Sequence, residues 1–118
     1  MRLPRWIFAT AGVYGLITLL PLYFLERRVT PAPNHPEYYY GFIGAALAFQ
    51  VLFLIVARDP RRLRPAMPAC ILEKVTWAVA LAWLWSQGRI EAPLPLFGVI
   101  DLIWAALFVA AYLKTPEP

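Results

Sequence analysis

Residues 36–57, with the sequence PEYYYGFIGAALAFQVLFLIVA, decide the fold class of this chain. The only charged residue in the run is Glu37, next to its start, and the only other strongly polar side chain is Gln50. A helix needs about 20 apolar residues to cross the roughly 30 Å hydrocarbon core of a bilayer. Only helices and closed barrels satisfy the backbone in hydrocarbon, and the run lacks the alternation of a barrel strand. It therefore predicts a membrane-spanning helix.

Three further runs have the same character, at residues 6–25, 65–85 and 96–113. Together the four runs take up most of the 118 residues, of which 61% are hydrophobic and only 15% charged. Soluble domains carry about 25% charged residues. We therefore predict an all-α polytopic membrane protein, in which residues 1–118 form a single four-helix transmembrane bundle without a separate soluble domain.

Prolines mark the ends of the predicted spans. Pro36 can occupy the first turn of the second helix and Pro65 that of the third, where the missing N–H costs no hydrogen bond. Pro60 ends the second helix, because proline disfavours helical geometry in the residue before it. Pro21 lies within the first run, and we expect it to kink that helix near its outer end.

The first run has two interpretations. Arg2 and Arg5 precede it, as basic residues precede the apolar part of a signal peptide. However, no small-x-small cleavage site leads into a soluble domain, and Glu26, Arg27 and Arg28 follow directly. We therefore expect a retained membrane anchor.

The Lys and Arg residues indicate the orientation of the bundle. They concentrate at the N-terminus, at the C-terminus and between the second and third runs. By the positive-inside rule these segments face the cytoplasm, so we predict that both termini are cytoplasmic. The net charge of +4 is then a topology signal. Because no soluble surface carries this charge, we expect the lipid bilayer and no nucleic acid as a partner.

Three charged residues lie inside the predicted spans: Glu73 and Lys74 in the third and Asp101 in the fourth. A charge near the bilayer centre costs roughly 2.5–3.5 kcal/mol on insertion scales, so each needs a structural or functional reason. We expect Lys74 to reach back to the cytoplasmic surface. Counted from the helix ends, Glu73 and Asp101 are separated by about 10–15 Å along the membrane normal, so they need not share one site.

Helical spacing allows Tyr14, Glu73, Trp77 and Asp101 to face one interior. One hypothesis is that these four side chains bind a lipophilic molecule with a polar head, or relay protons. The alternative is structural. In it the polar side chains only pair with one another, Asp101 with Tyr14 or Thr18, and Glu73 with Lys74, Arg61 or Arg64.

Two features of the second run indicate candidate interaction residues. Gly41, Gly44 and Ala48 form a small-residue face, which is typical of helix packing in membranes. Gln50 lies on the opposite face, where we expect it to contact another subunit or the edge of a neighbouring helix.

The connection at residues 58–65 is the densest charge cluster of the chain. It acts as a positive-inside anchor, or it offers Arg61 and Arg64 to an acidic partner or an anionic lipid. We also expect Asp59 to brace an arginine locally.

Catalytic and metal-binding patterns do not occur in the sequence. It has no glycine-rich phosphate loop, no HExxH and no paired Cys/His ligand spacing. His35 and Cys70 are the single residues of their types, and no nucleophile constellation surrounds either. We predict no catalytic residue and no metal site, favour a role other than that of an enzyme, and leave the cofactor open.

Several short motifs carry a family resemblance: Pro36-Glu37-Tyr38-Tyr39-Tyr40-Gly41-Phe42-Ile43-Gly44, Phe49-Gln50, Ala57-Arg58-Asp59-Pro60, Arg64-Pro65, Leu72-Glu73-Lys74 and the Gly98-x-x-Asp101 of the last run. In these the chain resembles a group of uncharacterised bacterial four-helix membrane proteins, broadly DoxX-like. The resemblance implies a four-helix bundle in the bacterial inner membrane and no established reaction. Small multidrug transporters are similar in length but depend on a glutamate in the first helix, which this chain lacks.

Two functional hypotheses follow from the sequence. The first is a structural or accessory subunit, which forms a homo-oligomer or joins a larger membrane complex. The alternative is a small transporter or binding protein for a lipophilic ligand, with a polar or proton-coupled site inside the membrane.

Overall fold

The computed structural model describes residues 2–28 and 34–118, and this part of the chain folds into helices and turns alone. Its α-helices are α1 (Arg2–Leu19), α2 (Pro36–Arg58), α3 (Met67–Ser86) and α4 (Leu94–Lys114). Short 3-10 helices occupy Leu20–Phe24, Glu26–Arg28 and Arg64–Ala66. The predicted all-α class is therefore confirmed.

Each α-helix, with the 3-10 turns that extend α1 and α3, is long and apolar enough to cross a bilayer. These candidate spans are Arg2–Phe24, Pro36–Arg58, Arg64–Ser86 and Leu94–Lys114. They overlap the four predicted runs and differ from them by a few residues at the ends. The chain is thus a four-span membrane protein.

Pro21, Pro36 and Pro60 act where the sequence predicts, whereas Pro65 lies in the 3-10 helix Arg64–Ala66 and α3 itself begins at Met67. α1 stops at Leu19, and the chain continues as a 3-10 helix that contains Pro21. α2 begins at Pro36 and ends at Arg58, directly before the Asp59-Pro60 pair. The helix ends are therefore determined locally, by residues that cannot continue an α-helix.

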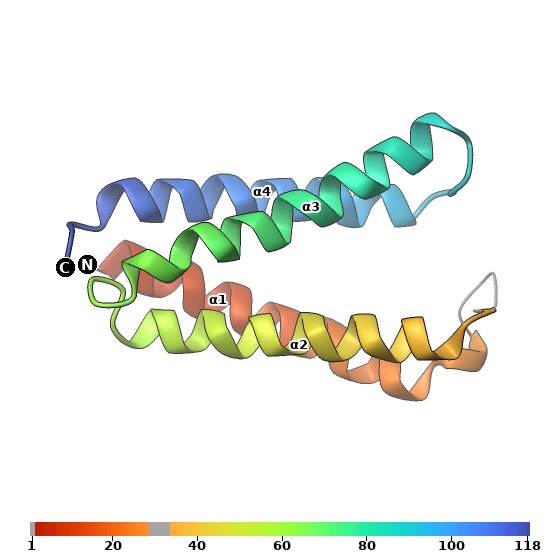
Figure 1. The fold of residues 1–118 in the computed structure, drawn as a ribbon, viewed down its shortest axis with the longest axis horizontal. Coiled ribbons are helices and arrows are strands. Elements are labelled where there is room, and N and C mark those ends of the chain that lie inside the picture. Colours follow the sequence, from red (N-terminus) through yellow and green to blue (C-terminus); the bar gives the residue numbers. More distant parts are fainter. Residues whose placement is uncertain (1, 29–33) are drawn as a thin grey trace.

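The helices pack as two antiparallel pairs, α1 with α2 and α3 with α4 (Figure 1). Both termini lie at one end of the bundle, beside the connection between α2 and α3 (Figure 1). We call this the terminal end and the opposite one the distal end. The two pairs lie close together at the terminal end and diverge towards the distal end (Figure 1).

An aromatic core joins the two pairs near the terminal end. The rings of Phe8 and Phe108 stack with their centroids 4.4 Å apart, and Phe53 meets Phe108 edge-on at 4.9 Å. All three side chains are fully buried. Smaller apolar residues complete the cluster: Ile7, Ala11, Val56, Met67, Cys70 and Ala111. Burial and ring contacts therefore hold α1, α2 and α4 together at this end.

Two glycines of α1 allow α2 to approach it closely. A Cβ atom on Gly12 would lie 2.8 Å from the Leu54 side chain and 2.9 Å from the backbone oxygen of Gln50. A Cβ atom on Gly15 would overlap the side chain of Gln50. Such small residues let helix backbones come together in membranes.

The small-residue face of α2 does not take part in this contact with Gly12 and Gly15. Within the described ranges, a Cβ atom on Gly41 would meet nothing within 4 Å, and one on Gly44 would meet only the Tyr23 hydroxyl, at 3.5 Å. Ala48 is exposed. The face formed by Gly41, Gly44 and Ala48 is therefore largely uncovered within this chain.

A glycine-to-alanine substitution, which adds one methyl group, tests the close contact between α1 and α2. We expect Gly12→Ala to lower the free energy of unfolding by about 1–3 kcal/mol, because the added Cβ meets backbone that cannot move aside. The matched variant Gly41→Ala adds the same group in open space and should leave stability unchanged or slightly raised. Thermal unfolding in a non-ionic detergent measures both, and equal effects of the two variants would contradict the contact.

Candidate functional site

A cavity of about 760 Å³ lies between the two helix pairs. Side chains from all the α-helices line it, and its walls are largely apolar, with Leu19, Phe42, Phe49, Trp77 and Phe97 among them. The volume falls within the roughly 300–1,000 Å³ typical of small-molecule sites.

The cavity occupies the middle and distal parts of the bundle. One of its polar residues, Lys74, lies against the aromatic core, with its Nζ 5.3 Å from the centre of the Phe53 ring. Leu22 and Leu94, which lie towards the distal end of the bundle, also line the cavity. The cavity is thus closed by the aromatic core on one side and widens where the pairs diverge.

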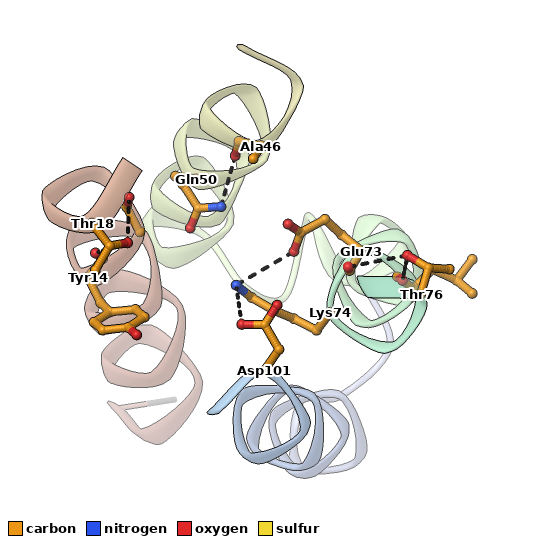
Figure 2. A network of polar contacts seen from close by, with 10 residues as sticks. Tyr14, Thr18, Ala46, Gln50, Glu73, Lys74, Thr76 and Asp101 are labelled. Carbon is orange, nitrogen blue, oxygen red and sulfur yellow. Dashed lines mark hydrogen bonds and ion pairs between the residues drawn. The ribbon is translucent and has the colours of Figure 1, made fainter. Parts of the chain in front are cut away.

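Three charged side chains meet at the floor of this cavity. Lys74 Nζ lies 3.7 Å from Glu73 Oε2 and 3.6 Å from Asp101 Oδ1. The ammonium group sits between the two carboxylates, in the space that the helices enclose (Figure 2). The Lys74 side chain is 5% exposed, and those of Glu73 and Asp101 are 17% and 15% exposed. We call these three residues the charged triad.

The register of α3 against α4 explains why the triad forms. A Cβ atom on Gly98 would lie 3.3 Å from the Leu81 side chain and 3.7 Å from the Ala78 backbone oxygen, so the two helices are in contact here. Because the helices are antiparallel, one turn forward from Gly98 lies level with one turn back from Ala78. Those positions are Asp101 and Lys74.

This arrangement corrects one expectation from the sequence and answers a question that the sequence left open. Lys74 does not reach back to the membrane surface but points into the bundle, where the residue is 4% exposed. Glu73 and Asp101 do not form separate sites, since both contact the same ammonium group. The depth counted from the helix ends was misleading, because the Gly98 contact sets the register and the lysine side chain spans the remaining distance.

The cavity floor also contains two oxygen atoms without hydrogen-bond donors. Within residues 2–28 and 34–118, Gln50 Oε1 and Glu73 Oε2 are buried, and neither accepts a hydrogen bond. Gln50 is 1% exposed, and its Nε2 donates to the backbone oxygen of Ala46 at 2.8 Å. Buried acceptors of this kind are rare in folded proteins and need a partner.

Gln50 does not face another subunit. It lies inside the chain against α1, where Gly15 leaves room for its side chain. Of the two sequence-based expectations for Gln50, contact with the edge of a neighbouring helix is the one confirmed. Sequence reasoning missed Gly15, because its contact with Gln50 depends on how α1 and α2 pack together.

The proposed ligand-site residues Tyr14, Glu73, Trp77 and Asp101 all line the same cavity. The Trp77 ring packs against Phe42, with the ring centres 4.9 Å apart. Tyr14 packs beside Trp104 at 5.9 Å. The structure therefore brings the four residues together, and binding at them stays a prediction.

The predicted structural pairings are realised only in part. Glu73 pairs with Lys74, as one alternative expected, but Asp101 also pairs with Lys74. The Thr18 hydroxyl donates instead to the backbone oxygens of Tyr14 and Gly15, at 3.0 and 3.1 Å. The sequence placed Lys74 at the surface and so missed the residue at the centre of the site.

A second, smaller hollow of about 360 Å³ lies between α2 and α3. Phe49, Glu73 and Thr76 line both this hollow and the main cavity. Leu72, which also lines the hollow, is 60% exposed and so belongs to the surface that a bilayer would cover. Glu73 therefore lies between the cavity and the lipid-facing side of the bundle.

The basic connection makes contacts within the chain. Arg64 Nε donates to the backbone oxygen of Tyr112 at 3.2 Å, and its guanidinium lies 3.9 Å from the centre of the Tyr112 ring. Arg61 Nε donates to the backbone oxygen of Glu117 at 3.3 Å. Asp59 accepts a hydrogen bond from the Arg62 backbone N–H, which confirms the expected local bracing. These contacts tie the connection to the end of α4.

No group of three or more His, Cys, Asp and Glu side chains able to hold a metal ion occurs in the described part of the chain. Comparison with known proteins finds no matching family model, no matching curated protein and no matching solved structure. The resemblance to DoxX-like proteins therefore rests on the short sequence motifs alone.

The charged triad predicts a strongly non-additive mutant series. Lys74→Met leaves two carboxylates inside the bundle without their shared cation, and we expect a loss of about 3–5 kcal/mol in the free energy of unfolding. Adding Glu73→Gln and Asp101→Asn removes all three charges and should restore most of that loss. Denaturation in detergent micelles measures both variants. A Lys74→Met protein as stable as the wild type would show that the ion pairs do not form.

Proposed function

We propose that this four-span membrane protein binds a lipophilic molecule with a polar head in the cavity between its helix pairs. The observation that carries the proposal is a cavity of about 760 Å³ with apolar walls and a charged floor in the middle of the bundle. A purely structural network of polar residues needs no such space around it. The cavity therefore supports the ligand-binding hypothesis more strongly than the accessory-subunit hypothesis.

The two parts of the cavity fit the two parts of such a molecule. Phe42, Trp77 and Phe97 offer apolar and aromatic surface to a hydrocarbon chain or ring. Glu73 and Asp101 offer hydrogen-bond acceptors at the deep end. A few convergent polar groups in a mostly apolar pocket are typical of sites that fix the orientation of a ligand.

The occupant is proposed to come from the bilayer. The hollow between α2 and α3 borders the same Phe49 and Glu73 that line the cavity, and exposed apolar residues such as Leu72 surround it. Phe49, Glu73 and Thr76 line both spaces, so the hollow and the cavity are neighbours. A lipophilic molecule could then pass sideways from the lipid without crossing water.

The membrane orientation is part of the proposal. The terminal end carries most of the Lys and Arg residues, including Arg58 and Lys114 (Figure 1). By the positive-inside rule this end is cytoplasmic, in a bacterial inner membrane as the family resemblance implies. The cavity would then open towards the outer half of the bilayer.

Assembly with other copies or with a larger complex is the second candidate function. It is supported by the uncovered face formed by Gly41, Gly44 and Ala48 on the outside of α2. Such a face allows close helix contact in membranes. The two candidates are compatible, because this face and the cavity lie on different sides of α2.

Filling the cavity tests the proposed function. Ala80 and Ala82 are both exposed, but only Ala80 lines the cavity. We expect the wild-type protein to retain at least one of dodecylamine, dodecan-1-ol and dodecanoate in native mass spectrometry from a non-ionic detergent. Ala80→Trp should abolish this retention, because the indole occupies the volume that the twelve-carbon chain needs, and Ala82→Trp should preserve it.

Two outcomes would contradict ligand binding in the cavity. One is that none of the three probes is retained by the wild-type protein. The other is that Ala80→Trp and Ala82→Trp retain probes equally well. The same spectra give the mass of the assembly, so a strictly monomeric protein without a bound partner would count against the second candidate.

A further inference from the structure

The charges at the cavity floor do not cancel. Among the described residues that line the cavity, only Glu73, Lys74 and Asp101 carry charges, so two carboxylates face one ammonium group. α1 contributes the neutral Tyr14 and α2 the neutral Gln50. With all three charged residues ionised, the floor has a net charge of about −1. An uncompensated charge away from water is costly, so this floor favours a positive partner.

The hydrogen-bond acceptors indicate the same kind of partner. Gln50 Oε1 and Glu73 Oε2 are buried, and neither accepts a hydrogen bond from residues 2–28 or 34–118. Glu73 Oε2 has only the ion pair with Lys74 Nζ, at 3.7 Å. The Gln50 amide orientation is fixed, because its Nε2 donates to the backbone oxygen of Ala46. The remaining atom is therefore an acceptor. Both oxygens can accept a hydrogen bond from a ligand, and neither group can donate from these atoms while Glu73 is ionised.

We infer that the occupant of this cavity is an amphiphile with a single positively charged head that carries N–H donors, such as a protonated alkylamine. The inference rests on the proposed function and adds the chemical class of the ligand. An ammonium head supplies one positive charge and three N–H donors. It therefore neutralises the floor and offers N–H donors to Gln50 Oε1 and Glu73 Oε2, which accept no hydrogen bond within the described residues. The apolar chain then lies along Phe42 and Trp77.

Other head groups match the floor less well. An alcohol offers one donor and no charge, so it leaves an acceptor unpaired. A carboxylate or sulfate adds negative charge beside Glu73 and Asp101, and like charges at short range are strongly unfavourable. A quaternary ammonium carries the positive charge without N–H donors. These differences separate the contributions of charge and of hydrogen bonding.

A panel of ligands with the same twelve-carbon chain tests the inference. Dissociation constants of dodecylammonium, dodecyltrimethylammonium, dodecan-1-ol and dodecyl sulfate are measured with the whole protein in non-ionic detergent. We expect dodecylammonium to bind about tenfold or more tightly than dodecan-1-ol, because hydrogen bonds to charged groups are the stronger ones. Dodecyltrimethylammonium should bind with intermediate affinity, and dodecyl sulfate most weakly.

Matched carboxyl-to-amide variants locate the preference. Glu73→Gln should weaken dodecylammonium binding about tenfold or more and leave dodecan-1-ol binding nearly unchanged. Glu91→Gln is the control, since Glu91 is exposed and lies outside the cavity. Asp101→Asn removes the same charge at a second position and replaces Glu73→Gln if that protein does not fold.

The outcomes distinguish the inference from the function on which it rests. If dodecan-1-ol or dodecyl sulfate binds as tightly as dodecylammonium, the cation preference is wrong while ligand binding stands. The same holds if the wild-type preference persists in Glu73→Gln or in Asp101→Asn. If no member of the panel binds, the proposed function itself fails. If a dimer forms through the cavity and Ala80→Trp abolishes it, a second copy is the occupant and the inference is overturned.

Discussion

The ammonium group of Lys74, held between the carboxylates of Glu73 and Asp101, is the interaction on which the rest of this structure depends. Each of these charges would be costly alone in a bilayer, and the single ammonium group offsets part of the cost of the two carboxylates. The pairing also links α3 to α4 at mid-height, since Asp101 is the only member from α4. A helix pair fixed in this way can stand apart from its neighbours without losing its register.

That independence accounts for the shape of the bundle. The contact of Gly98 with Ala78 fixes the register of α4 against α3, and the contact of Gly12 with α2 fixes how closely α1 approaches α2. The aromatic core around Phe108 joins the pairs near the terminal end. Beyond this core the pairs diverge, and the charged triad marks the point where packing gives way to the cavity. The position of the cavity thus follows from the positions of the glycines within each helix pair and of the large aromatic residues between the pairs.

The spans and their ends were predictable from the sequence, because helix length, apolarity and proline breaks are local properties. The gathering of Glu73 and Asp101 at one cavity was only partly predictable. Helical periodicity places them on inward faces, but their relative height depends on the contact at Gly98, which is a property of two helices together. The inward direction of Lys74 and the position of Gln50 against α1 could not be derived from the sequence, because both depend on how two helices pack together.

The separation of the Lys74 Nζ atom from the two carboxyl groups tests this account most directly. Solid-state NMR of the protein in lipid bilayers, with Nζ labelled by nitrogen-15 and the Asp and Glu carboxyl carbons by carbon-13, measures dipolar couplings between them. The account predicts couplings to both Glu73 and Asp101, consistent with N–O separations of 3.7 and 3.6 Å. Absence of both couplings, with the ammonium group in contact with lipid headgroups, would contradict it.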